Sequence, residues 1–172
     1  MQTILLRHAI AAPHDAVRYP DDGERPLTPH GRERMERAAR GLKALEGRFD
    51  LILTSPLLRA VDTARIVARA FRPSLDVKVL KPLAPGGGAG GVIAGLSALP
   101  ANASVLLVGH EPDLTRLAGA FVLEHRDALR ADFKKGGVCR IDFDDAPRLG
   151  DGRLIYLLPP RVLRGYRKTS GD

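Results

Sequence analysis

The sequence predicts an α/β fold in which a sheet is covered by helices on both faces. Short apolar segments, typical of buried strands, alternate with longer segments whose apolar residues recur at helical spacing. No internal repeat or linker divides the 172 residues, and this length is ordinary for one domain. We therefore expect residues 1–172 to form a single domain.

The first half of the chain repeats one unit, a strand followed by a helix. Residues 3–6 and 51–54 are compact apolar segments and predict buried strands. Thr28 and Pro29 have the pattern of a helix N-cap with proline at the first helical position, and Gly47 is a suitable helix end.

Ser55 and Pro56 repeat this opening, which predicts a second helix with Arg59 in its first turn. The rest of the chain continues the alternation. In chain order we expect a strand at 76–80, a glycine-rich loop at 86–91, a short helix ending near Leu99, a buried strand at 104–108, a helix at 112–123, and strands at 138–143 and 153–158.

Composition excludes several classes of protein. With 44% hydrophobic and 27% charged residues, the chain is not wholly disordered. It has no apolar run near the roughly 18 residues that span a bilayer, and no secretory signal, so we expect a cytoplasmic protein without a membrane partner. The one cysteine, Cys139, cannot form an internal disulfide or a Cys-rich zinc site, and we expect an inert buried thiol.

The net charge of +7 favours anionic partners. Arginines are interleaved with acidic residues over most of the chain, as at 32–37, which is typical of a solvated helix face and does not favour nucleic-acid binding. Only the C-terminal end is locally basic, and we expect residues 160–172 to form a basic tail. Its cations are Arg161, Arg164, Arg167 and Lys168.

Three of the predicted strand-to-helix junctions carry residues suited to anion binding. The first strand ends in Arg7 and His8, the second leads into Ser55 with Arg59 beyond it, and a later strand leads into His110. Ligands of open α/β sheets bind beyond the carboxyl ends of the strands, so we expect these junctions to converge on one crevice. Helix N-termini at this edge add positive potential and free N–H groups. The sequence therefore predicts a pocket for phosphate or a similar anion.

These residue types also predict a reaction. Neutral imidazole is a nucleophile toward phosphorus, and nearby guanidinium groups depress its protonation. Arginine binds phosphoryl oxygens bidentately, and phosphoryl transfer needs mainly positioning and electrostatic stabilisation. We expect two-step hydrolysis through a phosphohistidine. No ligand set in the sequence predicts a metal site.

Four motifs, in this order along the chain, resemble those of the histidine phosphatase superfamily. Leu6-Arg7-His8-Ala9 resembles its Arg-His-Gly signature. The segment at 22–28, with Gly31, resembles the marker of the small branch typified by the SixA phosphohistidine phosphatases. Residues 55–64 are similar to the second motif of the superfamily, and residues 108–112 to its second-histidine motif.

The resemblance implies a three-layer α/β/α sandwich of the phosphoglycerate mutase type, with a mostly parallel central sheet, no cofactor and a monomeric state. It implies that His8 is the phosphorylated nucleophile and that Arg7, Arg59 and His110 hold the phosphoryl group.

The resemblance also implies that Arg25 lies at the pocket mouth, contacting substrate or phosphate, with Asp22 beside it. We count Ser55, which opens the second motif, among the phosphate-binding residues.

The chain departs from the family pattern at two places. Ala9 replaces a glycine, so the loop after His8 is less able to approach a ligand. The acidic proton donor of the larger family members has no convincing equivalent, although Asp22 and Glu111 are candidates. An imidazole leaving group needs less help from an acid than an alkoxide does, and the short chain leaves no room for a large cap. We therefore expect phosphohistidine in a protein as the substrate.

Two other functions stay open at this stage. One is a general phosphomonoesterase acting on small phosphorylated metabolites or nucleotides. The other is a non-catalytic module that binds phosphate or a phosphoprotein. His14, His30 and His125 lie outside every motif, and we expect them on the surface.

The glycines at 86–91 formally match the G-x-G-x-x-G pattern of dinucleotide-binding proteins. Pro82 and Pro85 separate them from the preceding strand, which does not fit that motif. We interpret the glycines as a loop at the pocket rim.

Overall fold

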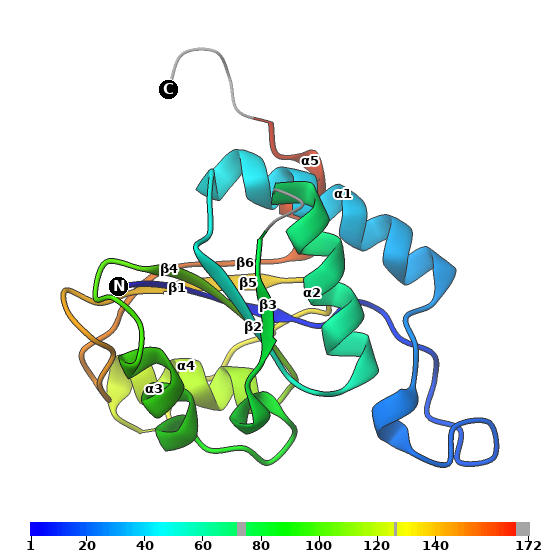
Figure 1. The fold of residues 1–172 in the computed structure, drawn as a ribbon, viewed down its shortest axis with the longest axis horizontal. Coiled ribbons are helices and arrows are strands. Elements are labelled where there is room, and N and C mark those ends of the chain that lie inside the picture. The colour runs from blue at the N-terminus through cyan, green and yellow to red at the C-terminus, as the bar shows by residue number, and fades with distance from the viewer. Residues whose placement is uncertain (72–74, 126, 168–172) are drawn as a thin grey trace.

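The computed structural model describes residues 1–71, 75–125 and 127–167 (Figure 1). Its strands form one sheet in the order β3-β2-β4-β1-β5-β6. The strands are β1 (Gln2–Arg7), β2 (Leu51–Thr54), β3 (Val77–Val79), β4 (Ser104–Gly109), β5 (Val138–Asp142) and β6 (Arg153–Leu158). The helices are α1 (Pro29–Glu46), α2 (Leu58–Phe71), α3 (Ala89–Ser97), α4 (Asp113–Leu123) and α5 (Pro160–Gly165), with short 3₁₀ turns η1 (Asp22–Glu24) and η2 (Lys81–Leu83).

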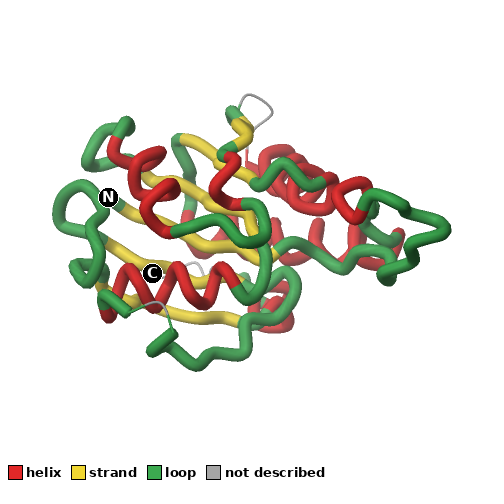
Figure 2. Tube along the Cα trace, turned by 90° about the horizontal axis from the view of Figure 1, so that it is seen from below, coloured by secondary structure: helices red, strands yellow, loops and turns green. Residues whose placement is uncertain are grey.

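Helices cover both faces of this sheet. Helices α1, α2 and α5 lie on one face, and α3 and α4 lie across the other (Figures 1 and 2). Side chains of β1 alternate between the two cores, with Ile4 and Leu6 in one and Leu5 in the other. Strands β3, β2, β4 and β1 are parallel, whereas β5 is antiparallel to both of its neighbours. The prediction of a three-layer α/β/α sandwich with a mostly parallel sheet is confirmed.

The N-terminus of α1 agrees with its predicted cap, whereas that of α2 does not. Thr28 caps α1 as expected, because its hydroxyl accepts a hydrogen bond from the Gly31 amide at 2.9 Å. The second prediction is wrong by two residues, since α2 begins at Leu58 rather than at Pro56. Ser55 is therefore not the N-cap residue of α2, although its hydroxyl accepts from the Leu57 amide just before the helix.

The C-terminal segment also differs from its prediction. We expected a tail from residue 160, but residues 160–165 form helix α5, which packs against α1. Leu163 is fully buried there, and this apolar contact explains why the segment folds despite its charge. Lys168 lies outside the described residues. None of the described helices is long and apolar enough to cross a membrane.

The segment between β1 and α1 projects from the body of the molecule (Figure 1). It is held at its base by α1, where the Thr28 amide donates to the Ile10 carbonyl at 3.0 Å. Gly31 lies against the same carbonyl, and a Cβ at this position would be 2.1 Å from the Ile10 oxygen. Only glycine allows this approach, so Gly31 fixes the path of the chain just beyond His8.

We expect Gly31→Ala to lower the free energy of unfolding by about 2 kcal/mol, because the new Cβ must displace the Ile10 backbone. Turnover falls as well, since the displaced loop begins at His8. Gly90→Ala is the matched control: Gly90 lies in α3 with no neighbour within 4 Å of its Cβ position, and the change is neutral or slightly stabilising. Urea unfolding of both variants tests this prediction, and equal losses would contradict it.

Candidate active site

The register of the parallel strands brings the site together. Arg7 of β1 pairs with Gly109 of β4, so His8 and His110, which follow them, emerge side by side. Their ring centroids are 5.0 Å apart. Strand β2 lies on the other side of β4, and the Ser55 amide donates to a β4 carbonyl at 2.9 Å. Three junctions that are distant in the sequence thus meet at one edge of the sheet, as expected.

His8 is buried and held in one tautomer. Its Nδ1 lies 2.7 Å from the Ala9 carbonyl oxygen, which can only accept a hydrogen bond. Nδ1 therefore carries the ring proton, and Nε2 keeps its lone pair. Burial lowers the pKa of His8 to about 3 against the opposing effect of the Ala9 hydrogen bond, and nearby His110, Arg59 and Arg7 lower it further. Burial, rather than the guanidinium charges we expected, is the main reason why His8 is neutral.

Thr63 fixes the residue that follows His8. Its hydroxyl accepts from the Ala9 amide at 3.0 Å and donates to the Arg59 carbonyl at 2.6 Å. The Ala9 amide is thereby engaged and does not point to a ligand. Thr63 was not singled out from the sequence, because its partner Ala9 is more than fifty residues away in the chain.

His110 is buried beside Ser55. Its Nε2 lies 2.8 Å from the Ser55 hydroxyl, which also accepts from the Leu57 amide at 3.3 Å. Burial lowers the pKa of His110 to about 4, and the charge of Arg59 contributes to this shift. Ser55 thus contacts His110 directly, a contact that its sequence motif did not reveal.

Of the two predicted arginines, Arg59 is buried and Arg7 is half-buried. Arg59 is 4% exposed, and its Nη1 and Nη2 donate to the Asp22 carbonyl and carboxylate at 2.7 and 2.9 Å. Arg7 donates through Nη1 to the Phe133 carbonyl at 2.7 Å. Three side-chain atoms in the described part of the chain are buried without a hydrogen-bond partner: Arg7 Nε, Arg59 Nε and His110 Nδ1. All three belong to the predicted site, and an anion is the ligand that satisfies such donors.

Asp22 connects Arg59 to Arg25. Arg25 Nε donates to the Asp22 carboxylate at 2.8 Å, and Arg25 Nη1 donates to the Ala12 carbonyl at 2.7 Å. Partial burial raises the pKa of Asp22, but the Arg25 hydrogen bond and the Arg59 charge outweigh it, so the pKa lies below its usual range. Asp22 is ionised at neutral pH and has no proton to donate.

Glu111, the other candidate acid, is bound to the start of α4. Its carboxylate accepts from the Thr115 amide at 3.1 Å and from the Thr115 hydroxyl at 2.7 Å. Both carboxyl groups that the sequence offered as proton donors are therefore engaged in other contacts.

Lys135 is a residue of this region that sequence reasoning did not assign to the site. Burial and the charges of Arg7, Arg25 and Arg59 lower its pKa, which places its amine near the same cluster. It lies there because β5 is antiparallel to β1, so that the segment before β5 borders the end of β1; the Gly136 amide donates to the Arg7 carbonyl at 3.0 Å. A lysine pair followed by two glycines before a strand was the available signal.

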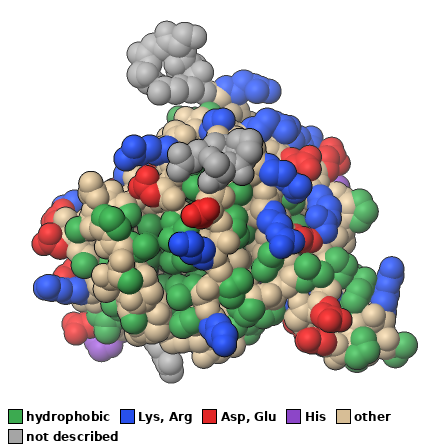
Figure 3. Space-filling model, in the orientation of Figure 1, with side chains coloured by type: hydrophobic (Ala, Val, Ile, Leu, Met, Phe, Trp, Pro, Cys, Tyr) green, Lys and Arg blue, Asp and Glu red, His purple; other side chains and the backbone are tan. Residues whose placement is uncertain are grey.

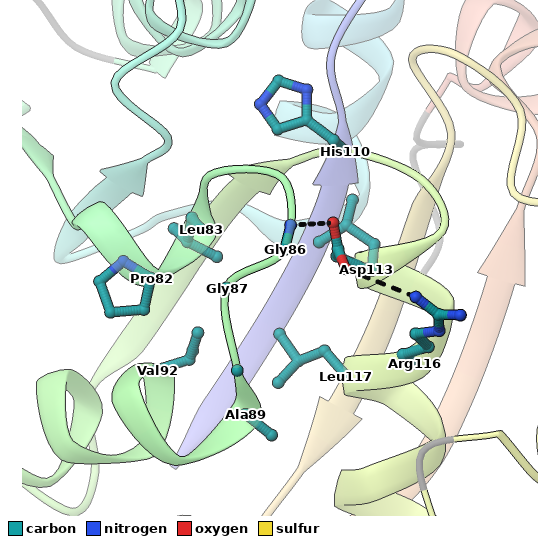
Figure 4. A pocket seen from close by; sticks show the side chains of 12 residues that line it. Pro82, Leu83, Gly86, Gly87, Ala89, Val92, His110, Asp113, Arg116 and Leu117 are labelled. Atoms are coloured by element: carbon teal, nitrogen blue, oxygen red, sulfur yellow. Dashed lines mark hydrogen bonds and ion pairs between the residues drawn. The ribbon is translucent and has the colours of Figure 1, made fainter.

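A small cavity of about 150 Å³ adjoins His110 (Figure 4). It is lined mainly by apolar side chains of α3, α4 and η2, and the glycine loop closes one side. The Gly86 amide donates to the Asp113 carboxylate at 3.0 Å, and a Cβ on Gly87 would lie 1.9 Å from the Pro82 oxygen. The glycines therefore permit close packing at the rim, as expected. The helix that follows, α3, begins within the glycine run.

The predictions for Cys139 and for the three histidines outside the motifs are confirmed. Cys139 is buried, and burial raises the pKa of its thiol to about 12. His14, His30 and His125 are exposed. No cluster of three or more His, Cys, Asp or Glu side chains suited to a metal ion occurs among the described residues.

The two buried histidines predict a pH dependence of stability. Below the ordinary pKa of 6.5 the unfolded chain takes up a proton at His8 and at His110, whereas the folded chain does so only near pH 3 and 4. The free energy of unfolding therefore falls as the pH decreases, by about 2 kcal/mol between about pH 6 and pH 5. Urea unfolding at both pH values tests this. In a His8→Asn/His110→Asn variant most of the difference should disappear, and an unchanged slope would contradict the assignment.

The sequence and the fold of this chain are similar to those of known proteins. The model of the histidine phosphatase superfamily (branch 1) matches residues 3–84. An uncharacterized protein of Picosynechococcus sp. is 40% identical over 168 residues, which cover 95% of this chain and 99% of that protein. Phosphohistidine phosphatase SixA of Escherichia coli is 36% identical over 126 residues, 72% of this chain and 73% of SixA. A solved structure of the protein histidine phosphatase SixA with tungstate has 30% identity, covers 95% of this chain and 99% of its own, and gives a TM-score of 0.80.

Proposed function

Because the chain belongs to the histidine phosphatase superfamily, we propose that it hydrolyses phosphohistidine in a protein, with His8 as the nucleophile that carries the phosphoryl group. One observation carries the assignment of the nucleophile: His8 Nδ1 donates to the Ala9 carbonyl at 2.7 Å, so Nε2 presents its lone pair. The low pKa of His8 keeps this lone pair available at neutral pH.

The phosphoryl group binds among the buried donors in this proposal. Arg7 Nε, Arg59 Nε and His110 Nδ1 are N–H groups that a tetrahedral anion can satisfy, and two of them carry positive charge. The tungstate in the related SixA structure is an anion of this shape. These donors neutralise charge on the equatorial oxygens while phosphorus is transferred.

In the first step His8 Nε2 attacks phosphorus and forms a P–N bond. The P–N bond to the substrate imidazole breaks, and its electron pair returns to that ring, which leaves neutral when its other nitrogen is protonated. In the second step a water oxygen attacks phosphorus, the bond to His8 breaks, and the proton of the water passes to solvent. His8 is thereby regenerated, and inorganic phosphate is released.

The carboxyl groups around the site support the choice of a phosphoramidate substrate. An alkoxide leaving group needs a proton from a positioned acid, whereas an imidazole does not need it to the same degree. Asp22 is ionised between Arg25 and Arg59, and Glu111 is bound to Thr115. This arrangement favours phosphohistidine over alkyl phosphates, which a general monoesterase must cleave.

The wild-type protein, incubated with ³²P-labelled phosphohistidine protein and quenched in alkali, should acquire acid-labile label that maps to His8. His8→Ala should carry no label and lose turnover by at least about 10³-fold, because the covalent step is removed. His14→Ala is the matched control on an exposed histidine and should behave as the wild type.

The phosphorylated compound that labels the protein distinguishes between the alternative functions. Label from p-nitrophenyl phosphate alone would favour a general phosphomonoesterase, and label from neither donor would favour a binding module. Equal turnover by the wild type and His8→Ala would rule out the mechanism.

Ser55 is proposed to position His110. Its hydroxyl accepts from the Leu57 amide and can donate to His110 Nε2, which leaves the ring proton on Nδ1, the atom without a partner. We expect Ser55→Ala to lower kcat about tenfold with a smaller change in KM, since the tautomer is no longer fixed. Ring ¹⁵N shifts of His110 should move toward a mixture of tautomers. Ser97→Ala, which changes an exposed hydroxyl on α3, is the control. Unchanged ring shifts in Ser55→Ala would contradict this role.

A further inference from the structure

A groove of about 770 Å³ is lined in part by Arg7, the residue that precedes His8. Its walls come from three parts of the chain: α1, the segment before β5, and the connection from β6 into α5. The segment before β5 also contacts the site at His8, because Arg7 Nη1 donates to the Phe133 carbonyl at 2.7 Å. Arg7 connects the groove to the site, because it lines the groove and its charge acts on His8.

The rim of the groove is strongly basic. Arg34 lies on α1, Lys135 precedes β5, and Arg161 and Arg164 lie on α5. None of these four side chains forms an ion pair with a carboxylate among the described residues, unlike Lys134, which pairs with Asp132. Figure 3 shows Lys and Arg side chains at the end of the molecule that carries α5. Unpaired cations of this kind, held on separate elements, favour a partner that brings its own negative charges.

The floor of the groove is apolar. Ile10, Leu157, Pro159 and Pro160 form it, and each of them is partly exposed. An apolar floor beneath a charged rim is the usual arrangement of a protein-binding surface. A single phosphate or a small metabolite cannot cover both the floor and the four cations. Sites for single-stranded nucleic acid combine cations with aromatic side chains on which the bases stack, and the lining of the groove has no aromatic residue.

We propose that this groove binds a polypeptide segment of the phosphorylated protein, one in which Asp or Glu residues alternate with apolar residues near the phosphohistidine. The inference rests on the proposed function, since it assumes that the phosphoryl group arrives on a protein. The apolar side chains of the segment cover Ile10 and Leu157, while its carboxylates meet Arg34 and Arg161. The groove thus selects the protein, and the pocket at His8 performs the chemistry.

Two synthetic peptides, each with one phosphohistidine, test the proposal. One has Asp, Glu and Leu around that residue, and the other has Ser and Gly. At low ionic strength the wild type should show a kcat/KM about tenfold higher for the acidic peptide, and added salt should reduce this preference. Arg34→Glu/Arg161→Glu should abolish the preference and leave kcat/KM for the neutral peptide within about twofold.

Lys78→Glu/Lys81→Glu is the matched control. It makes the same change in net charge with exposed lysines next to the opposite edge of the sheet, and it should keep the preference. If the wild type cleaves both peptides equally, or the groove variant keeps the preference, the groove proposal is overturned while the proposed function stands. If neither peptide is cleaved, both fall. Inhibition by a single-stranded oligonucleotide that is lost in the groove variant, without any peptide preference, would assign the groove to nucleic acid instead.

Discussion

Buried N–H donors without an acceptor destabilise a folded protein, and the site around His8 contains three of them. Two belong to Arg7 and Arg59, whose charges also lose hydration on burial. Asp22 compensates part of this cost at Arg59, and a backbone carbonyl does so at Arg7. An anion that accepts hydrogen bonds from these donors would offset the remaining free-energy cost of burying them. The folded state thus holds donors that are suited to an anion, and each surrounding element must keep them in place.

The sheet meets this requirement through its register. Because β1, β4 and β2 are parallel neighbours, their carboxyl ends lie level, and the residues that follow them share one edge. His8 and His110 are each one residue beyond a paired strand, which leaves little freedom in their spacing. Thr63 adds a second constraint by connecting the backbone after His8 to the first turn of α2. The geometry of the site is thus set by strand pairing, with side-chain contacts refining it.

Features that depend on local chemistry were predictable from the sequence, such as the cap at Thr28 and the strands that precede His8 and His110. Features that depend on long-range pairing were not. The role of Ser55 follows from a hydrogen bond to another strand, and the position of Lys135 follows from the antiparallel direction of β5. Helix α5 was missed because the basic segment offers few apolar residues, and only the burial of Leu163 against α1 shows that the segment folds.

The contacts of Asp22 and Glu111 bear on which leaving groups such a site could accept. In the proposed mechanism the buried donors bind the phosphoryl oxygens whether nitrogen or oxygen leaves, so they would not select the substrate class. That selection depends on whether a protonated acid lies near the leaving atom. Here Arg25 and Arg59 keep Asp22 ionised, and Thr115 holds Glu111 on α4. If the proposed function holds, acceptance of O-linked substrates would call for a protonated carboxyl group near the leaving atom, while the sheet, His8 and the buried donors could stay as they are.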